Sequence, residues 1–549
     1  MSEKTYSIPS FLERILTFFE HERFDIFSMF LWILTLSVIR MWSEAYLLDY
    51  PYKEISFRYL FFQAHITSFF IVAFIGGVLL LKFFSNQKLA KVANLAGLGF
   101  LMVLVPPFLD VFIFKSSTPY DYISPLQFFE ALFTLGTSEN INWGGAGVIF
   151  ELMGITGATS LYVFIKRFQD GIVNAVKYTL VNFVTFIVFF LIIGSPFLML
   201  LRGGISPGAE IIQPLFVLRY LLISVVLILL LIRITKKGLL SSFIKSSRLM
   251  TTAHFGLMTF VGIIISAHLF QIGPIAFDFF ALFSDPLYLR IFPGNMAMFL
   301  LSIITIMFVW QYAVMINHVY DVNIDKLDNK DRVLPLKMLT LAQVKKIALI
   351  YAIVSLGLGF LMGMWSLLLV AIGLFFGTIY SMPPIRIRDG VFSTTIIGIG
   401  SSIAFFLGFY TPSYVKVMYG EFAGEIMRVY PDLSTDSVII GVLIFVALTI
   451  GPLIKDYKDY EGDKKAGVKN LFTIYGLEKG VKITTFLLPI PFLCLILLFH
   501  NIIDILLLVP AGIFAAVVFN KMRDTRLVFA IYFPIIIYCL LRWFSIIQW

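Results

Sequence analysis

The sequence predicts an all-α protein that crosses a membrane many times. Hydrophobic residues make up 59% of its 549 residues and charged residues only 14%, with a mean hydropathy of +0.92. An ordinary soluble domain is about 25% charged. A helix needs about 20 mainly apolar residues to cross the hydrocarbon of a bilayer. About fifteen stretches of the chain meet that requirement.

The predicted spans fall into two groups, separated by a basic loop at residues 233–248. Six spans precede the loop and nine follow it. We therefore expect an N-terminal membrane domain at residues 1–240, to which the sequence assigns no function, and a second membrane domain at 245–549. The fifteen predicted spans are 24–48, 59–83, 92–114, 145–166, 173–200, 212–234, 249–270, 293–319, 342–362, 364–381, 391–411, 437–455, 480–499, 502–519 and 527–547.

Basic residues indicate which loops face the cytoplasm, because Lys and Arg are enriched on that side. If the N-terminus is inside, the basic clusters at 82–91, 166–167, 233–248 and 521–526 all fall in cytoplasmic loops. This orientation places the C-terminus outside and favours the cell membrane as the location. The loops also explain the net charge of +9, and without an arginine-rich stripe no nucleic-acid partner is expected.

The N-terminal residues lack a short apolar core that ends in a small-residue cleavage site, so no cleaved signal peptide is expected. Apolar residues at helical spacing within 10–22 predict either an interfacial helix or a soluble cap helix. Cys494 and Cys539 lie in apolar segments. We expect them to be core residues, not a disulfide or a metal pair.

Two acidic clusters follow long apolar runs on the predicted cytoplasmic side. The first is Asn317-x₃-Asp321-x₃-Asp325. Residues four apart share one helical face, so these three side chains should line up over about 12 Å. Ionisable side chains at a membrane boundary are costly, which favours a functional interpretation over solvated helix ends. The second cluster is Asp456, Asp459 and Asp463.

The clusters have the chemistry of a magnesium site for a diphosphate. Mg²⁺ prefers carboxylate and phosphate oxygens in octahedral geometry. Bridged to a diphosphate, the ion would neutralise the leaving group and position the carbon that reacts. The proposed metal ligands and catalytic residues are Asp321, Asp325, Asp459 and Asp463.

Three segments resemble the UbiA-type intramembrane prenyltransferases. NHVYDVNIDKLDNKDR, from Asn317, is similar to the first Asp-rich motif of that family, and KDYKDYEGDKKAGVKNL, from Lys455, to the second. YSMPPIRIR, from Tyr380, resembles the segment that follows the family's fourth helix. The resemblance covers residues 245–549.

The resemblance implies nine helices around a central cavity and Mg²⁺-dependent transfer of a polyprenyl group from its diphosphate to a lipophilic or phosphate-bearing acceptor, as in lipid or quinone biosynthesis. Asn317, Asp321 and Asp325 would bind one metal–diphosphate face, and Asp459 and Asp463 the other. Further substrate-binding candidates are Tyr380, Arg386, Arg388, Arg332, Lys458 and Asp456.

The chain also departs from the family pattern. His318 stands where the family often has Asp, and the stretch Arg332–Lys337 replaces the usual Arg-Pro-Leu-Pro-Ser-Gly. His318 is either an acceptor-side base or a boundary histidine with satisfied hydrogen bonds. The second motif looks nearest to members that act on glycerol-phosphate-type or chlorin-type acceptors.

Two other functions remain open on the sequence. One is a phosphoribosyl-type transfer onto a polyprenyl phosphate, and the other is an inactive lipid-binding or transport scaffold. Within the first 240 residues, ionisable side chains in apolar stretches predict structural pairs, Asp110 with Arg219 or Glu151 with Arg40.

Overall fold

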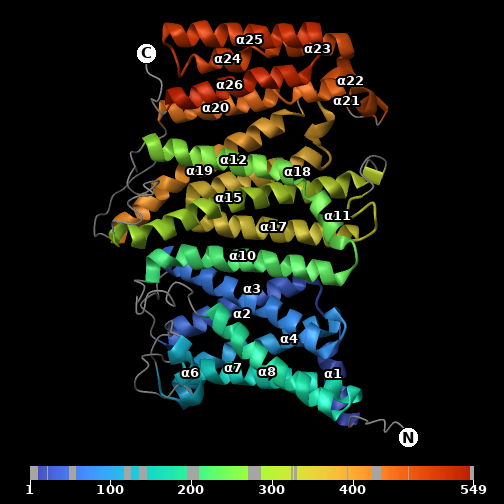
Figure 1. Cartoon of the computed structure of the whole chain (residues 1–549), viewed down its shortest axis with the longest axis vertical. Helices are drawn as coiled ribbons and strands as arrows, with labels where there is room; N and C mark the ends of the chain where they lie inside the picture. The colour runs from blue at the N-terminus through green and yellow to red at the C-terminus, as the bar shows by residue number, and fades with distance from the viewer. Residues whose placement is uncertain are drawn as a thin grey trace. The chain divides into compact units, whose positions relative to one another are not determined.

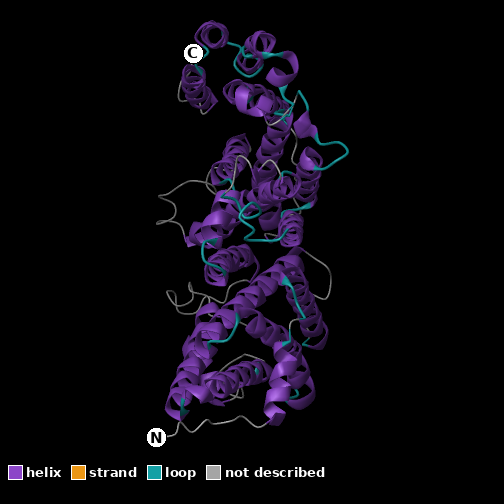
Figure 2. Cartoon of the chain, turned by 90° about the vertical axis from the view of Figure 1, so that its right-hand side faces the viewer, coloured by secondary structure: helices purple, strands orange, loops and turns teal. Residues whose placement is uncertain are grey.

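The computed structural model describes a chain built from helices and loops. It describes residues 10–21, 23–48, 57–116, 125–134, 145–194, 209–269, 286–322, 325–326, 331–391, 393–422, 434–465, 467 and 469–543, without every side chain in them. Within these ranges there is no β-strand (Figure 2). The prediction of an all-α membrane protein is confirmed.

Fourteen helices of the described residues are long and apolar enough to cross a bilayer, by length and composition. They correspond to fourteen of the fifteen predicted spans. The remaining one, at 480–499, is broken into α23 (Leu477–Leu487) and α24 (Ile490–Leu495). Pro489 and Pro491 lie at the break, where each lacks the backbone N–H that a continuous helix requires. The apolar run therefore predicted a straight span where the chain forms a broken one.

The helices divide into two compact units, Met1–Leu240 and Ser241–Trp549. Those of the first unit are α1 (Ser10–Glu20), α2 (Ile26–Leu47), α3 (Phe57–Ser85), α4 (Leu89–Gly99), η1 (Phe100–Leu104), α5 (Val105–Phe108), η2 (Leu109–Ile113), α6 (Pro125–Thr134), α7 (Ala146–Arg167), η3 (Phe168–Asp170), α8 (Ile172–Gly194) and α10 (Ala209–Thr235).

The boundary between the two units lies within α11 (Leu239–Ser246). The other helices of the second unit are α12 (Leu249–Leu269), α15 (Pro286–Tyr320), α17 (Leu341–Leu361), α18 (Met364–Ser381), η4 (Ile387–Asp389), α19 (Thr395–Phe422), α20 (Thr435–Ile450), α21 (Leu453–Lys465), α22 (Leu471–Tyr475), α23, α24, α25 (Ile502–Met522) and α26 (Thr525–Trp543).

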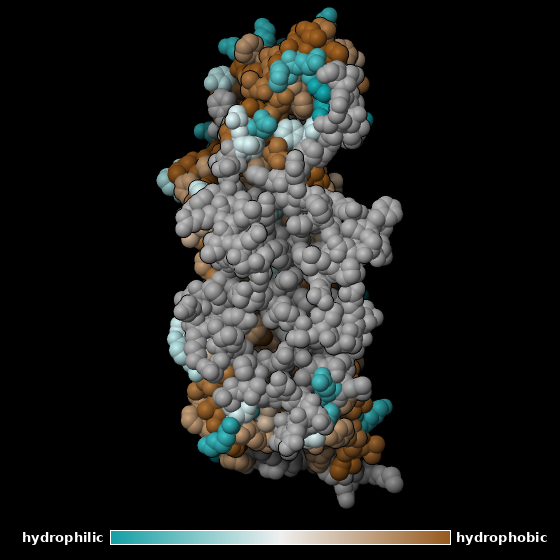
Figure 3. All heavy atoms as spheres, turned by 90° about the vertical axis from the view of Figure 1, so that its left-hand side faces the viewer, coloured by the Kyte–Doolittle hydropathy of each residue, from teal (hydrophilic) through white to brown (hydrophobic). Residues whose placement is uncertain are grey.

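In the first unit, α3 contacts α2, α4, α7, α8 and α10. Its Phe70, Phe74 and Val78 belong to a buried apolar core with Phe100 and Phe186. Hydrophobic residues also make up much of the described surface on the face drawn in Figure 3, as expected for helices that face lipid.

Buried polar groups of the first unit find partners inside it. The guanidinium of Arg40 contacts Glu44 on its own helix and lies 3.5 Å from Glu151 on α7. The predicted Arg40–Glu151 pair is therefore present. The Asp110 carboxylate instead accepts a 2.6 Å hydrogen bond from the Gly147 backbone N–H, while the Arg219 guanidinium donates to the carbonyl of Ile192 at 2.7 Å.

Helix α1 is fastened to this unit through Glu20, which is only 6% exposed. Its carboxylate contacts the ammonium groups of Lys166 and of Lys91, the latter at 3.0 Å, and accepts from the Tyr162 hydroxyl at 3.1 Å. Burial by itself would raise the pKa of Glu20, but the hydrogen bonds and charges of these neighbours outweigh it and lower the pKa.

Protonation of Glu20 should therefore release α1. Because the folded-state pKa is lowered, the stabilisation is complete above the ordinary carboxyl pKa of about 4.3 and is lost as the pH falls through the lowered value. Hydrogen exchange of the α1 amides, corrected for intrinsic rates, should rise on acidification. Glu20→Gln should exchange fast already at neutral pH, whereas Glu478→Gln, at an exposed carboxylate, should leave α1 protected. Equal protection in Glu20→Gln would contradict this role.

In the second unit, α12, α15, α17, α18 and α19 lie side by side (Figure 1). The contact between α12 and α19 depends on two glycines. A β-carbon on Gly408 would lie 1.9 Å from the Thr259 carbonyl oxygen, and one on Gly262 would lie 2.0 Å from the Phe405 carbonyl oxygen. Helices in membranes use such small residues to bring their backbones together.

Gly408→Val should separate α12 from α19. Overpacking costs about 1–3 kcal/mol or more, and here the obstacle is backbone, so we expect a lower melting temperature of the detergent-solubilised protein. Gly357→Ala is the matched control, because a β-carbon there meets nothing within 4 Å. Equal melting temperatures for the two variants would rule out this packing requirement.

Candidate functional site

The first acidic cluster begins in the last turn of α15, at Asn317, and extends beyond the end of that helix at Tyr320. The Asp321 N–H donates to the Asn317 carbonyl and the Asp325 N–H to the Asp321 carbonyl, both at 2.9 Å. This i→i+4 pattern keeps the three side chains on one face. All three are buried, with exposed fractions of 4%, 3% and 3%. Buried carboxylates require compensating charge.

Arginines from the segment after α18 compensate Asp321. The guanidinium of Arg386 donates to one carboxylate oxygen at 3.3 Å, and that of Arg388 contacts the other. Arg386 also pairs with Asp389 at 3.0 Å. Two residues of the YSMPPIRIR segment thus contact the first motif, although they lie more than 60 positions after Asp321 in the sequence.

Asp325 is held by Arg332 and His318. The Arg332 guanidinium donates to one carboxylate oxygen, and the His318 Nδ1 lies 3.0 Å from the other. The pKa of Asp325 is lowered: burial alone would raise it, but the hydrogen bond with His318 and the charges of Arg332 and Arg248 outweigh that effect. Asp325 is therefore ionised at neutral pH.

His318 occupies a tightly defined position. Its Nε2 lies 2.9 Å from the Ser246 carbonyl oxygen while Nδ1 faces Asp325, so both ring nitrogens have acceptors as neighbours. The ring is 1% exposed. Both ring nitrogens thus face acceptors of the protein itself, which favours the boundary histidine over an acceptor-side base.

Arg248 completes the site, and the sequence had indicated it only as part of a basic loop. Its guanidinium donates to Asn317 Oδ1 at 2.8 Å, while Asn317 Nδ2 donates to Asp321 at 2.6 Å and to the Ser381 hydroxyl at 3.2 Å. Arg248 and Arg386 both have positive φ, 46° and 39°. Such conformations are costly for residues other than glycine and cluster at functional sites.

Arg332 and Arg248 lie close enough to affect each other. Burial and the charge of Arg248 lower the pKa of Arg332, and the charge of Asp325 opposes that shift. Around the first motif, the guanidinium groups of Arg248, Arg332, Arg386 and Arg388 face the carboxylates of Asp321, Asp325 and Asp389. These guanidinium groups can donate charge-assisted hydrogen bonds to an anionic ligand.

The second acidic cluster lies on α21, together with Lys458. The side chains of Asp459 and Asp463 are outside the described residues, so their predicted role as metal ligands stays a prediction. Asp456 is partly buried and lies within electrostatic range of the partly buried Tyr380, whereas Lys458 is exposed. Among the described side chains, no three metal-binding residues of the His, Cys, Asp or Glu types come together.

Residues 279–528 match the model of the UbiA prenyltransferase family. This part of the chain is therefore similar to the UbiA prenyltransferases. Its UbiA relatives indicate a transferase of prenyl groups, and the predicted resemblance is confirmed.

Two curated relatives and one solved structure illustrate the range of the UbiA family. Digeranylgeranylglyceryl phosphate synthase of Saccharolobus solfataricus is 26% identical over 226 residues, which cover 40% of this chain and 73% of that protein. Homogentisate phytyltransferase of a Synechocystis species is 27% identical over 182 residues, covering 32% of this chain and 54% of the relative. A UbiA homolog from Archaeoglobus fulgidus, solved with GPP and Mg²⁺, has 19% identity and a TM-score of 0.35, covering 51% of this chain and 86% of that one.

Proposed function

We propose that residues 245–549 form a UbiA-type domain that transfers a polyprenyl group from its diphosphate to a lipophilic or phosphate-bearing acceptor, at the cytoplasmic face of the cell membrane. The arginine-rich surroundings of two buried carboxylates carry this proposal. Such a site suits a polyanion, since a guanidinium can pair with a carboxylate or with phosphoryl oxygens.

The donor set around Asn317 fits Mg²⁺. Asp321 and Asp325 are buried oxygen donors on one helical face, the type of ligand that this hard cation prefers. Two carboxylates leave positions for water and substrate oxygens, as is usual for magnesium. Asp321 and Asp325 would hold the ion, with Asp459 and Asp463 proposed as ligands of a second. The metal would neutralise the charge of the departing diphosphate.

The side chains of this protein would bind and orient the donor. Arg386 and Arg388 can exchange their ion pairs with Asp321 for ion pairs with phosphoryl oxygens. Arg332 can exchange its ion pair with Asp325 in the same way. Such an exchange frees each carboxylate at the moment when an anion enters. Tyr380 and Asp456, on α18 and α21, are proposed to contact the diphosphate and the acceptor respectively.

Arg248→Gln should weaken donor binding more than it slows turnover. The variant removes a charge that faces Asn317 at the end of the site, and one charged contact is worth about 1.5–3 kcal/mol. We expect a rise of about 10-fold to 100-fold in KM for prenyl diphosphate. Arg233→Gln, in the last turn of α10, should behave like the parent. A change in kcat alone would contradict a binding role for Arg248.

The activity is tested by incubating membranes that contain the full chain with radiolabelled geranylgeranyl diphosphate or longer prenyl diphosphates, with and without Mg²⁺. The acceptor panel holds glycerol-phosphate lipids, aromatic acids, quinone precursors and chlorins. Mg²⁺-dependent label in one acceptor supports the proposal and names the acceptor. If no acceptor is labelled and no donor binds, the phosphoribosyl and scaffold functions take its place.

A further inference from the structure

The N-terminal unit contains an elongated cavity of about 620 Å³. Its lining residues run along α3 from Phe62 to Leu81 and along α7 from Val148 to Ile165. At 1.5 Å per residue, these stretches measure about 28 and 26 Å. The volume lies within the range of about 300–1,000 Å³ that is usual for small-molecule sites.

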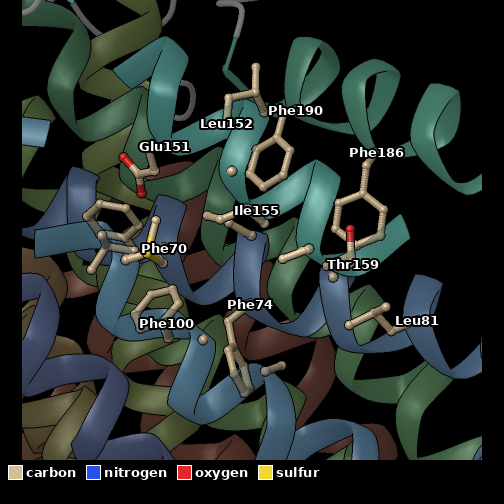
Figure 4. Close-up of a pocket in the computed structure, with 18 of the residues that line it drawn as sticks. Phe70, Phe74, Leu81, Phe100, Glu151, Leu152, Ile155, Thr159, Phe186 and Phe190 are labelled. Atoms are coloured by element: carbon tan, nitrogen blue, oxygen red, sulfur yellow. The ribbon is translucent and has the colours of Figure 1, made fainter. Parts of the chain in front are cut away.

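The walls of the cavity are apolar and aromatic. Figure 4 shows the rings of Phe70, Phe74, Phe100 and Phe186 between Glu151 on one side and Leu81 on the other. At about 30 Å³ per heavy atom, the share of one molecule in liquid water, the cavity has room for about 20 heavy atoms. That corresponds to one extended hydrocarbon chain, and a lipid with two such chains would need about twice the volume.

One end of the cavity is polar and rich in hydrogen-bond acceptors. Arg40, Glu44 and Glu151 line it, and the Arg40 guanidinium donates to Glu44, to the Val103 carbonyl and, at 3.5 Å, to Glu151. Asp110 lies within electrostatic range of Glu44. Among the described side chains at this end, the three carboxylates outnumber the guanidinium of Arg40, so a head group that donates a hydrogen bond fits here and an anionic one is repelled.

The opposite end is covered by α1. Ile15, Leu16 and Phe19 line the cavity there, next to Tyr162, whose hydroxyl donates to Glu20. An apolar chain that starts at Glu151 would therefore end beneath the apolar face of α1. The cavity is thus apolar along most of its length, and its charged lining residues, Arg40, Glu44 and Glu151, lie at one end.

We propose that this cavity binds a membrane lipid with a single chain of about 20 carbons that ends in an uncharged hydroxyl. The chain can be isoprenoid or straight, since the walls require only an apolar chain. The hydroxyl would donate its hydrogen bond to the carboxylates at the Glu151 end. This inference is independent of the transfer activity proposed for the second unit, and its test measures binding alone.

The experiment uses the full chain in detergent, labelled by a photoreactive C20 isoprenoid alcohol and analysed by peptide mass spectrometry. Label is expected on the lining stretches of α3 and α7. Ala158→Trp fills the cavity from α7 and should weaken binding at least about 10-fold. Gly157→Trp is the matched control. Gly157 is next to Ala158 in the chain but does not line the cavity, and a β-carbon on it meets nothing within 4 Å. Its labelling should match the parent.

Competition identifies the ligand. Geranylgeraniol, eicosanol and geranylgeranyl phosphate compete for the label; displacement by either alcohol supports the proposal and separates isoprenoid from straight chains. The phosphate should compete at least about 10-fold more weakly, and Glu151→Gln should reduce that difference. Label that survives Ala158→Trp, or equal competition by the phosphate, overturns the proposal. If Ala158→Trp does not fold, Gly154→Phe fills the same cavity and serves in its place.

Discussion

Asp321→Asn should abolish most prenyl transfer while the protein stays folded. The substitution keeps the size of the side chain but removes the charge that balances Arg386 and Arg388 and that would hold Mg²⁺. Loss of one electrostatic contact to a transition state typically costs about 10²–10³ in rate. Turnover of radiolabelled prenyl diphosphate measures the effect, and the melting temperature checks folding.

The control for Asp321→Asn is Asp331→Asn in the following loop. Asp331 has a side chain that is 71% exposed and pairs with Lys245, so its loss should leave turnover close to the parent rate. If Asp321→Asn retains full activity with every donor and acceptor in the panel, Asp321 is not a metal ligand. If both variants fail equally, the loop matters for folding instead.

Arg542→Met should destabilise the second unit more than any surface substitution. The Arg542 guanidinium grips the fully buried Asp504 of α25 through Nε and Nη2, both at 3.0 Å, and Tyr538 donates to the same carboxylate. Removal of one partner from a buried pair costs about 3–5 kcal/mol, because the remaining charge is left uncompensated. Thermal or denaturant unfolding in detergent measures the loss.

A double variant tests the cause of that loss. Asp504→Leu combined with Arg542→Met removes both charges and should recover much of the stability, since an apolar pair of similar volume can replace a buried ion pair. Arg526→Ala, at the exposed start of α26, should have little effect. Failure of the double variant to recover would point to packing by the Arg542 side chain as the main contribution.

Local sequence patterns were sufficient for the features that depend on neighbouring residues. Of the fifteen spans predicted from apolar run length, fourteen correspond to long apolar helices of the described residues. The four-residue spacing matches a helix that turns Asn317, Asp321 and Asp325 to one face. The broken span at Pro489 is also local, because the prolines are visible in the sequence, but run length was given more weight than their missing N–H groups.

Long-range partners could not be read in the same way. Arg248 lies 69 positions from Asn317, and Ser381 lies 64 positions from it. In the sequence, Arg248 is one basic residue among several in a loop, and only the fold selects it. Arg386 and Arg388 were predicted from the resemblance to the family motif. Helical periodicity alone does not indicate that they contact Asp321.

The amide of Asn317 has two distinct sides, and its surroundings determine which way it points. The Arg248 guanidinium donates a hydrogen bond to the amide oxygen, so the NH₂ group faces Asp321 and Ser381. An anion that drew Arg248 away would free the amide to rotate by half a turn and present its oxygen toward Asp321. The same side chain would then change from a hydrogen-bonding link between Arg248 and Asp321 into an additional oxygen ligand. Binding of the anion would thus turn the Asn317 oxygen toward the position where a cation would bind.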